Sequence, residues 1–469
     1  MGSTDIDRQI NAVVSHLHSR EQAAGPRRAA GSGRRYVRPC MLWGMQIPLR
    51  PSSAAVLLIA AFITAADAHA APVCDVRSMG GKGDGSTKDT AVIQRAIDAC
   101  APKRGTVVLE GGKFLSAPLT LKSGVTLRIA PGATLLGSRD LEDYPIRQDA
   151  KWRRVALLHG DHLRNVTVNG GGTVDGSGDV FWKLAHEHRV PGDTSGSGGF
   201  PRPMLIDITE SQHLEFSNLT AQNSPMYNFT FFFCDGIKID HVVIRNPDRT
   251  APNTDGIDPF SSRNIEISNV DIDTGDDDIA LKSGLVERDP KIGPVEHVYI
   301  HDSVFRRGHG LSVGSELAGG IRDVRVENVE MDGTDAGVRI KSNRGRGNDI
   351  HDLHYRNIRM TNVRQPIQIT EYYPRIPDTD VAPAIDAHTP RFHDISLENI
   401  SATGAEDAVI VGLPEMPVRA LTLSNVTIAA QRPMRIRNAE VRMRHVQVTV
   451  PGGKGIVEEI GARLERGGQ

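Results

Sequence analysis

The sequence has little of several features that mark other classes of protein. Aromatic residues make up 5% of the 469 residues, and 57 Asp and Glu almost balance 55 Lys and Arg. A chain without excess positive charge has no broad attraction for nucleic acid or an anionic membrane. None of the four cysteines has a partner at the Cys-x-x-Cys spacing of a zinc site. An anionic ligand must therefore be bound by a few local basic residues.

Long apolar runs are also scarce. The run Ala54–Ala66 has about 13 residues, which is too short to span a bilayer. Arg50 precedes the run and Ala68-His69-Ala70 follows it, a pattern typical of a secretory signal peptide rather than of a membrane anchor. We therefore expect a non-native or disordered extension over residues 1–44 and a signal peptide over 45–70. A secreted or periplasmic folded domain is expected over 71–469.

Removal of such a signal leaves three cysteines. Cys74 and Cys100 flank the first segment of the remaining chain, and an oxidising compartment would allow them to form a disulfide. Cys234 lies in the apolar sequence FTFFFCDG, which predicts a buried free thiol.

One short pattern recurs along the chain: an alternating apolar strand, then Asn or Asp, then a second short strand. The copies are LRNVTVNG from 163, HLEFSNLTA from 213, GIKIDHVVI from 236, NIEISNVDI from 264, HVYIHDSVF from 297, VRVENVEM from 324, DLHYRNIRM from 352, DISLENISA from 394 and ALTLSNVTI from 420. Most lie about 23 to 33 residues apart, the period of a solenoid. Their period-2 alternation predicts parallel strands in successive coils, hence a parallel β-helix. A β-sandwich would instead have strands every 8 to 12 residues or so, joined by hairpin turns.

Three local features refine this prediction. Asn suits the bend between the two strands because it tolerates left-handed backbone conformations. The apolar spacing of Thr87–Ala99 predicts an amphipathic helix capped by Ser86 or Thr87, and roughly the last twenty residues are the only other candidate helix. The long separations from 163 to 213 and from 352 to 394 predict insertions.

Four polar segments fall on consecutive coils of the repeat. They are Asn253-Thr254-Asp255-Gly256-Ile257-Asp258, Gly275-Asp276-Asp277-Asp278, Gly308-His309-Gly310 and Arg339-Ile340-Lys341. Adjacent coils of a parallel solenoid stack about 4.8 Å apart, so one column of these residues would be about 15 Å long. That length matches a few sugar units.

The residue types in this column suit acid–base chemistry. Carboxylates placed close together cannot all ionise cheaply, so the pKa of one rises and a protonated acid comes to lie beside an ionised base. Such a pair is what glycoside hydrolysis requires. Arg339 and Lys341 share one face of a strand and can hold the carboxylate of an acidic sugar, while His309 can tune the acid. Each segment alone is more often a turn or a solvated face, but four in coil register favour a functional site.

In this order, NTDG, GDD, GHG and RIK resemble the four signature motifs of the polygalacturonase family, family 28 of the glycoside hydrolases. CDVRSMGGKGDGSTKDT, GVTLRIAPGATLLGS, GTVDGSG and Asn223-Ser224-Pro225 are similar to the family as well. The resemblance implies an all-β, right-handed, single-stranded parallel β-helix of the pectin-lyase-like type with a short N-terminal helix. It also implies hydrolysis of α-1,4-linked galacturonic acid in pectin with inversion of configuration and without a metal or cofactor. A monomer is expected separately, because a solenoid with capped ends is usually monomeric.

Residue roles follow from the same resemblance. Asp276 would protonate the glycosidic oxygen, Asp255 and Asp277 would activate the attacking water, and His309 would support the acid. Substrate binding is expected from Asn253, Arg339, Lys341 and Tyr373, with Tyr372 the less favoured of the two tyrosines.

Asp278 departs from the family pattern, which often has Cys or Asn after GDD. Strict strand alternation would place Asp276 and Asp278 on one face and Asp277 on the other. The implied roles therefore require a bend at Gly275–Asp277, with Asp278 in a structural role.

Other functions remain open at this stage. Within the family, hydrolysis of rhamnogalacturonan or xylogalacturonan is the alternative, and RIKSNRGRG is similar to exo-acting bacterial members. The long non-repeating stretches 178–202 and 372–391 could close one end of a binding site or leave it open. A Ca²⁺-dependent pectate lyase would use Asp255, Asp276 and Asp277 as metal ligands. A non-catalytic β-helical adhesin would show no register among the charged residues.

Overall fold

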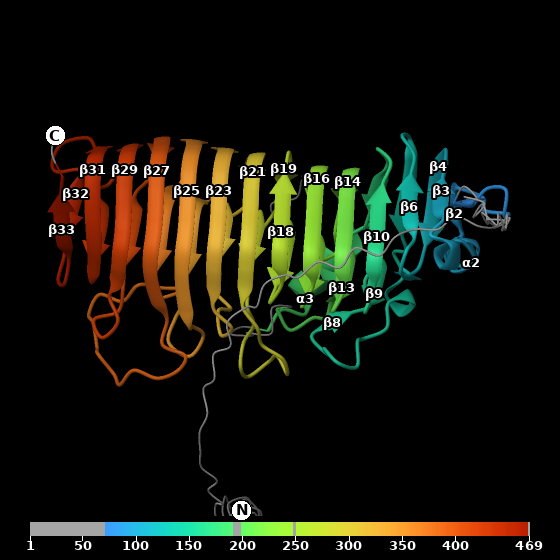
Figure 1. The fold of residues 1–469 in the computed structure, drawn as a ribbon, viewed down its shortest axis with the longest axis horizontal. Coiled ribbons are helices and arrows are strands. Elements are labelled where there is room, and N and C mark those ends of the chain that lie inside the picture. The colour runs from blue at the N-terminus through green and yellow to red at the C-terminus, as the bar shows by residue number, and fades with distance from the viewer. Residues whose placement is uncertain (1–70, 191–197, 247–249, 468–469) are drawn as a thin grey trace, which may run out of the picture. The chain divides into compact units, whose positions relative to one another are not determined.

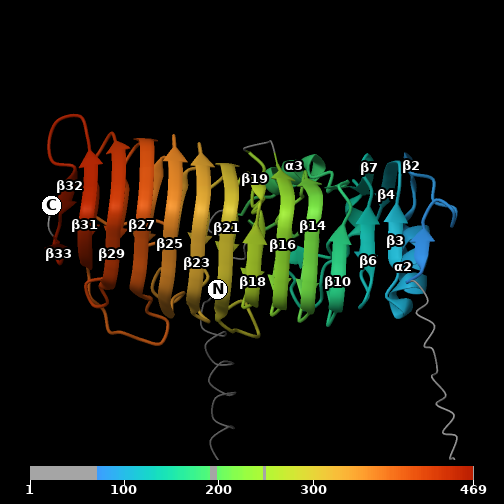
Figure 2. The same ribbon diagram turned by 45° about the horizontal axis from the view of Figure 1, so that its top comes forward.

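The computed structural model describes residues 71–190, 198–246 and 250–467. Over these residues the chain forms a right-handed parallel β-helix, in which each strand pairs with its equivalent in the next coil (Figures 1 and 2). This confirms the fold predicted from the repeats. The expected extension and signal peptide, residues 1–70, lie outside the described residues.

Two large parallel sheets form the walls of the coil. Sheet A contains β1 (Val73–Asp75), β2 (Asp84–Lys88), β3 (Thr106–Leu109), β4 (Gly112–Ser116), β6 (Thr126–Ile129), β7 (Ala133–Gly137), β10 (Arg164–Asn169), β11 (Thr173–Asp175), β14 (Gln212–Gln222), β16 (Asp235–Arg245), β18 (Arg263–Ser268), β19 (Asp271–Asp273), β21 (Val295–Arg307), β23 (Ile321–Asp332), β25 (Asp349–Thr361), β27 (Arg391–Ala405), β29 (Val418–Ala430), β31 (Ala439–Thr449) and β33 (Arg463–Arg466). Sheet B contains β5 (Leu119–Thr120), β9 (Leu158–Asp161), β13 (Ile206–Thr209), β15 (Phe229–Phe232), β17 (Ile257–Phe260), β20 (Ile279–Leu281), β22 (Leu311–Val313), β24 (Ala336–Lys341), β26 (Gln365–Thr370), β28 (Ala408–Val411), β30 (Met434–Arg437) and β32 (Ile456–Glu458). A small additional sheet pairs β8 (Arg153–Arg154) with β12 (Arg202–Pro203).

The repeat pattern explains how each coil closes around an apolar core. In β23 the inward side chains are Val324 and Val326 before the bend and Val329 and Met331 after it. The alternation therefore slips by one residue, and Asn328 takes up the slip with a left-handed backbone, φ 56°. Because of this bend, both halves of the strand keep their apolar side chains inside.

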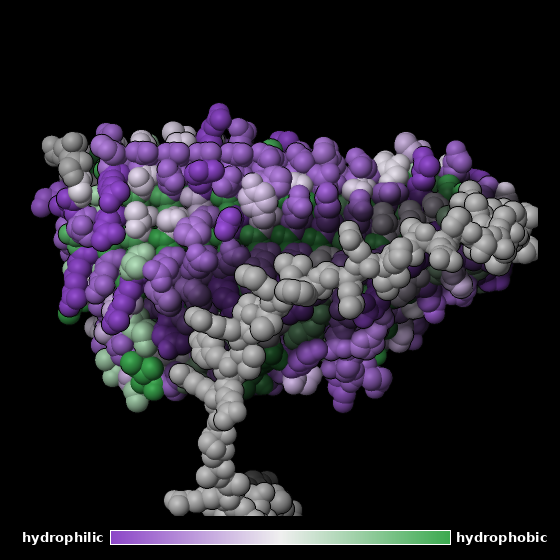
Figure 3. Space-filling view, in the orientation of Figure 1, coloured by the Kyte–Doolittle hydropathy of each residue, from purple (hydrophilic) through white to green (hydrophobic). Residues whose placement is uncertain are grey.

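Asn residues at this bend also stack along sheet A. The side-chain amides of Asn357, Asn399 and Asn425 each donate to the side-chain oxygen of the preceding Asn at 3.0 Å. All three have positive φ, as the sequence predicts for the bend residue. Figure 3 shows rows of polar side chains over this face, with an apolar band running across the coils.

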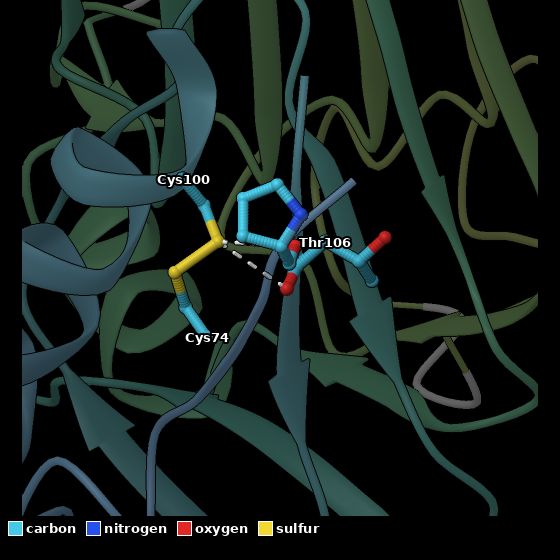
Figure 4. Close-up of a disulfide and its surroundings, with 4 residues drawn as sticks. Cys74, Cys100 and Thr106 are labelled. Atoms are coloured by element: carbon cyan, nitrogen blue, oxygen red, sulfur yellow. Dashed lines mark hydrogen bonds between the residues drawn. A yellow bond between two sulfur atoms is a disulfide. The ribbon is translucent and has the colours of Figure 1, made fainter. Parts of the chain in front are cut away.

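Helix α2 (Thr90–Cys100) covers the N-terminal end of the coil, and the turn η2 (Ala101–Lys103) follows it. Its inward side chains, among them Ile93 and Ile97, join the core. A disulfide between Cys74 and Cys100 fastens the end of α2 to β1, which confirms the pairing allowed by the sequence (Figure 4). Cys234 is buried and free, also as predicted.

The helix begins three residues later than predicted. The carboxylate of Asp84 accepts hydrogen bonds from the N–H groups of Ser86 and Thr87 at 2.8 and 2.7 Å. These bonds keep both residues in the extended strand β2, so Asp89 takes the N-cap position and the predicted caps were wrong.

Two further predictions about helices need correction. The final residues form β32 and β33 rather than a helix. Conversely, the sequence did not reveal the turn η3 (Leu141–Asp143), which precedes the first long insertion, or helix α3 (Asp179–Glu187), which lies within it. In Figure 1, β8, α3 and the orange loop of residues 371–390 lie along the lower side of the coil stack. No helix in the described ranges is long and apolar enough to cross a membrane.

Candidate active site

The four polar segments come together at one end of the strands of sheet B. Asp255 precedes β17, Asp276 and Asp277 precede β20, and His309 precedes β22. Arg339 lies within β24, where it pairs in register with Ser312 rather than with His309. The segments are therefore neighbours, as predicted, although the column is offset at Arg339. The long side chain of this arginine spans the offset.

Asp277 is at the centre of the cluster, and only 4% of its side chain is exposed. Its Oδ1 lies 2.7 Å from Arg339 Nη1 and accepts a hydrogen bond from Ser312 Oγ at 2.8 Å. Its Oδ2 lies 2.7 Å from Lys341 Nζ. Burial alone would raise the pKa of Asp277, but Lys341 and Arg339 outweigh burial and hold this pKa well below its usual range. Asp277 is therefore ionised, and in the free protein it binds both cations expected to hold the substrate.

Asp276 and His309 form a second, partly exposed pair. His309 Nδ1 lies 3.1 Å from Asp276 Oδ1, and His309 Nε2 lies 3.4 Å from Asp335 Oδ2. Burial acts to raise the pKa of Asp276, but the hydrogen bond and charge of His309 overcome it and lower this pKa. In turn the carboxylates overcome the effect of burial on His309 and raise its pKa. The pair therefore holds one proton, mainly on the histidine.

Asp255 has a different environment. It is buried, and its Oδ2 lies 2.8 Å from Lys282 Nζ, which also lies 2.7 Å from Asp258 Oδ2. Burial raises the pKa of Asp255 to about 7 even though Lys282 opposes the shift. The sequence predicted a raised pKa for one carboxyl of the cluster. Among Asp255, Asp276 and Asp277 it belongs to Asp255, and the pKa values of the neighbouring Asp258 and Asp278 are raised as well.

The bend expected at Gly275–Asp277 is present. Residues 275 and 276 form a bend and 277 lies outside any strand, so Asp276 and Asp277 both reach the cluster. Asp278 is fully buried, with its Oδ2 accepting from Gly310 N at 3.0 Å and its Oδ1 3.2 Å from Thr274 Oγ1. Burial raises the pKa of Asp278 well above its usual value. Its contacts hold two turns together, in agreement with the structural role predicted for it.

Tyr373 lies over the basic side of the cluster. Its ring centre is 5.7 Å from the guanidinium carbon of Arg339 and 5.3 Å from Lys341 Nζ. Arg339 Nε also donates to Gln368 Oε1 at 2.7 Å. Tyr372 points elsewhere, and its hydroxyl donates to Asp380 Oδ1 at 2.9 Å. Of the two tyrosines, the favoured Tyr373 is the one at the cluster.

Asn253 is held by a residue that the sequence analysis missed. Its side-chain oxygen accepts a hydrogen bond from Arg202 Nη2 at 2.6 Å, and its backbone has φ 55°. Arg202 is fully buried and also donates to the carbonyls of Pro225 and Pro252 at 3.0 and 2.6 Å. In the free protein, Asn253 thus fixes the turn before Asp255.

Other residues of the site also escaped the sequence analysis: Lys282, Ser312, Asp335 and Gln368. Lys282 had a signal, because a lysine after the apolar strand IAL falls at an outward position of sheet B. Arg202 had none, because its place depends on how the insertion folds back.

Asp276, Asp277 and His309 are close enough to share a metal ion, with ligand atoms within 4.8 Å of one another. Both oxygens of Asp277 already bind side-chain cations, however. An added divalent cation would have to displace Arg339 and Lys341, so this donor set fits a metal poorly.

The site has a partly exposed strip, formed by Asp276, His309, Arg339, Gln368 and Tyr373, between two covered regions of sheet B. On the N-terminal side, an apolar cluster covers the outer face of β15 and β17; it contains Ala156, Met204, Met226, Tyr227, Phe232 and Phe260, with Trp152 packed against it. On the C-terminal side, a second cluster covers β28; it contains Tyr372, Val409, Val411 and Leu413, with Ile376 and Met416 packed against it. The exposed strip extends from β20 to β26, about 15 Å at the usual strand spacing.

Comparison with known proteins identifies relatives over most of the chain. The model of glycosyl hydrolases family 28 matches residues 101–447. A probable polygalacturonase of Vitis vinifera is 32% identical over 77% of this chain and 74% of its own. An endo-polygalacturonase of Pectobacterium carotovorum subsp. carotovorum is 31% identical over 77% of this chain and 89% of its own. The structure of a family 28 exopolygalacturonase of Yersinia enterocolitica superposes with a TM-score of 0.72 at 23% identity, over 84% of this chain and 78% of that one.

Proposed function

Because the chain belongs to glycosyl hydrolases family 28 and is a glycosidase, we propose that it hydrolyses the α-1,4 linkages of galacturonan, the acidic backbone of pectin. The observation that carries this substrate is the pairing of Arg339 and Lys341 beside the partly exposed Asp276. Two cations next to a proton donor suit a sugar that carries one carboxylate per residue.

Asp276 is the general acid of the proposed reaction. It is the member of the carboxylate cluster that a sugar can reach, since 26% of its side chain is exposed against 4% for Asp277. Binding of a galacturonate carboxylate to Arg339 and Lys341 weakens their hold on Asp277 and makes the cluster more negative. That change, with the loss of water, moves the shared proton from His309 to Asp276, which then protonates the leaving oxygen.

The two buried carboxylates act on the water. Arg339 and Lys341 hold the pKa of Asp277 well below its usual range, so Asp277 is the ionised partner, and together with Asp255 it binds the attacking water, whose proton passes to one of the two carboxylates. Asp255 Oδ1 is buried and has no hydrogen-bond partner among the residues that the structure describes. Acid and base groups thus come from separate carboxyls, which inversion by direct attack of water requires. No step in this scheme requires a metal.

We infer exo action, or action on short oligogalacturonides, from the covered regions on both sides of the exposed strip. Phe232 and Phe260 on one side and Val409 and Val411 on the other are at most 7% exposed, because insertions pack over them. A long polymer cannot contact sheet B continuously past either cluster. A chain end or an oligomer of a few units fits the strip between them.

The test is digestion of polygalacturonic acid by the purified protein with and without chelator. Reducing ends without ultraviolet-absorbing product, insensitive to chelator and abolished in Asp276→Asn, support the proposal. Release of monomer or dimer from the start supports exo action, whereas a falling ladder of oligomers overturns it. Unsaturated, chelator-sensitive products would mean a Ca²⁺-dependent lyase. Cleavage only of rhamnogalacturonan or xylogalacturonan would assign a decorated substrate.

We also propose that the protein works as a secreted or periplasmic monomer. The Cys74–Cys100 disulfide is stable only in an oxidising compartment, which supports export. N-terminal sequencing of the exported protein should begin near Ala71, and its mass in solution should be that of one chain. Retention of residues 45–70 or a stable dimer would contradict these two points.

A further inference from the structure

Lys282 occupies an unusual position beside the proposed catalytic carboxylates. It directly follows β20, pairs with Phe260 of the preceding coil and is 4% exposed. Its ammonium group lies 2.8 Å from Asp255, 2.7 Å from Asp258 and 4.0 Å from Glu316. A lysine is rarely buried so completely unless its charge is compensated, which these carboxylates achieve.

Aromatic rings complete the environment of Lys282. Its Nζ lies 4.4 Å from the ring centre of Tyr227 and 5.3 Å from that of Phe260. These rings exclude water and fix the direction of the ammonium group. Glu316 is already neutralised by Arg288 at 2.7 Å, so the charge of Lys282 is directed mainly at Asp255 and Asp258.

The sequence Asn223-Ser224-Pro225 forms the turn that supports this arrangement. Ser224 Oγ donates to the carbonyl of Tyr227 at 2.9 Å and fixes the tyrosine beneath Lys282. Next to it, Asn228 donates to the carbonyl of Asp255 from both its backbone N–H and its side-chain amide, at 2.8 and 2.9 Å. One turn therefore orients both the lysine's aromatic neighbour and the backbone of the carboxylate.

We propose that Lys282 is a positioning residue for Asp255: its ammonium group binds Oδ2 and stabilises the negative charge of the carboxylate, so that Oδ1 can take the proton of the attacking water. This inference rests on the proposed role of Asp255 in activating water. It assigns Asp258 a different part, because Asp258 is fully buried behind Lys282 and shares its charge without reaching the exposed strip.

Electrostatics at the site agree with this role. Burial raises the pKa of Asp255, and Lys282 is the strongest opposing influence, whereas Asp276 and Asp277 raise it further. Without the lysine, Asp255 would stay protonated to higher pH. The charged and titratable groups that face Asp255 are Lys282, Asp258, Asp276, Asp277, Tyr227, Arg202 and, across Lys282, Glu316.

The experiment measures kcat/KM on oligogalacturonide against pH for the full chain and for Lys282→Met. In Lys282→Met, the acid limb of the pH profile should move to higher pH. At pH values below this limb, kcat/KM should fall about tenfold for each pH unit by which the limb moves. Lys282→Arg should restore the limb toward its original position even where kcat stays low. Lys291→Met is the matched control, since Lys291 is an exposed lysine paired with Glu210 at 2.6 Å. A uniform loss at every pH, or no loss, overturns the inference.

A second variant covers the case in which Lys282→Met does not fold. Lys282→Met combined with Asp258→Leu removes both partners of the buried pair, a change that proteins often tolerate. An upward displacement is again expected, smaller than in Lys282→Met because Asp258→Leu also removes a negative charge beside Asp255, and a limb that is unmoved or moved to lower pH overturns the inference. The variant Asp255→Asn distinguishes failure of the role proposed for Asp255 from failure of the role proposed for Lys282. If Asp255→Asn keeps full activity, the proposed function of Asp255 fails; if it is inactive while the limb in Lys282→Met is unmoved, only the role of Lys282 fails.

Discussion

Arg339 Nη1 lies 2.7 Å from Asp277 Oδ1, although the two residues are 62 positions apart in sequence. The coil brings them together because each turn of the solenoid returns the chain to the same face. This contact holds the guanidinium group of Arg339 at the site and keeps Asp277 ionised. A substrate carboxylate must share or replace it, so binding and catalysis are linked through one side chain.

Replacement of this arginine should therefore affect both steps. In Arg339→Gln, we expect KM to rise and kcat to fall, with a loss of about 100-fold or more in kcat/KM, as for removal of one partner of a buried charge pair. Steady-state kinetics on a galacturonate trimer measures both constants. Arg435→Gln is the control, because Arg435 follows Gln368 and Val409 in the same outward register but lies beyond the covered β28. A comparable effect of Arg435→Gln would show that the binding site extends past the apolar cluster.

Loss of the proton shared by Asp276 and His309 should set the alkaline limb of the pH profile of activity. The raised pKa of His309 means that the pair keeps its proton below that pKa and loses it as the pH rises through it. In His309→Gln the proton can reside only on Asp276, a carboxyl that releases it at lower pH than a histidine paired with an acid. The alkaline limb should then move to lower pH, and kcat should fall by about 10- to 100-fold.

Kinetics from acid to alkaline pH on both proteins checks this expectation. His301→Gln is a suitable control, since His301 pairs with Asp302 on sheet A, away from the cluster. An alkaline limb that stays in place in His309→Gln would assign it to another group and remove His309 from the proton path.

The fold and the core of the site were accessible from sequence because their signals are local or periodic. Apolar alternation within the strands and the Asn that recurs at the bend of each coil predict a solenoid. Each polar motif recurs at a similar place in its coil, so the motifs are expected to lie side by side. The start of α2 was missed because the Asp84 carboxylate binds the N–H and hydroxyl groups of Ser86 and Thr87 and holds both residues in β2. Arg202 and the clusters over β15 and β28 were missed because their places depend on how insertions pack, which has no periodic signature.

The Cys74–Cys100 disulfide closes the N-terminal end of the coil and should stabilise it. It joins residues 26 apart, a loop for which the chain-entropy model gives about 3 to 4 kcal/mol. We expect Cys74→Ala combined with Cys100→Ala to lower the free energy of unfolding by that order, measured with urea. The wild-type protein under reducing conditions should lose a similar amount. Cys234→Ala provides a control for general effects of removing a cysteine, and an unchanged double variant would show that α2 docks without the disulfide.

Asp278 gives a prediction whose sign depends on pH. Burial raises the pKa of this carboxyl in the folded protein, so folding favours its protonated form. Relative to a neutral side chain, the wild type therefore loses stability as the pH rises from the unfolded pKa toward the folded one, by up to about 1.4 kcal/mol per pH unit. Asn is nearly isosteric: its oxygen can accept from Gly310 N, while its amide donates to Thr274 Oγ1. Asp278→Asn should match the wild type in urea unfolding near pH 4 and exceed it at pH 7. An equal or smaller free energy of unfolding for the variant at pH 7 would mean that Asp278 is ionised in the folded protein.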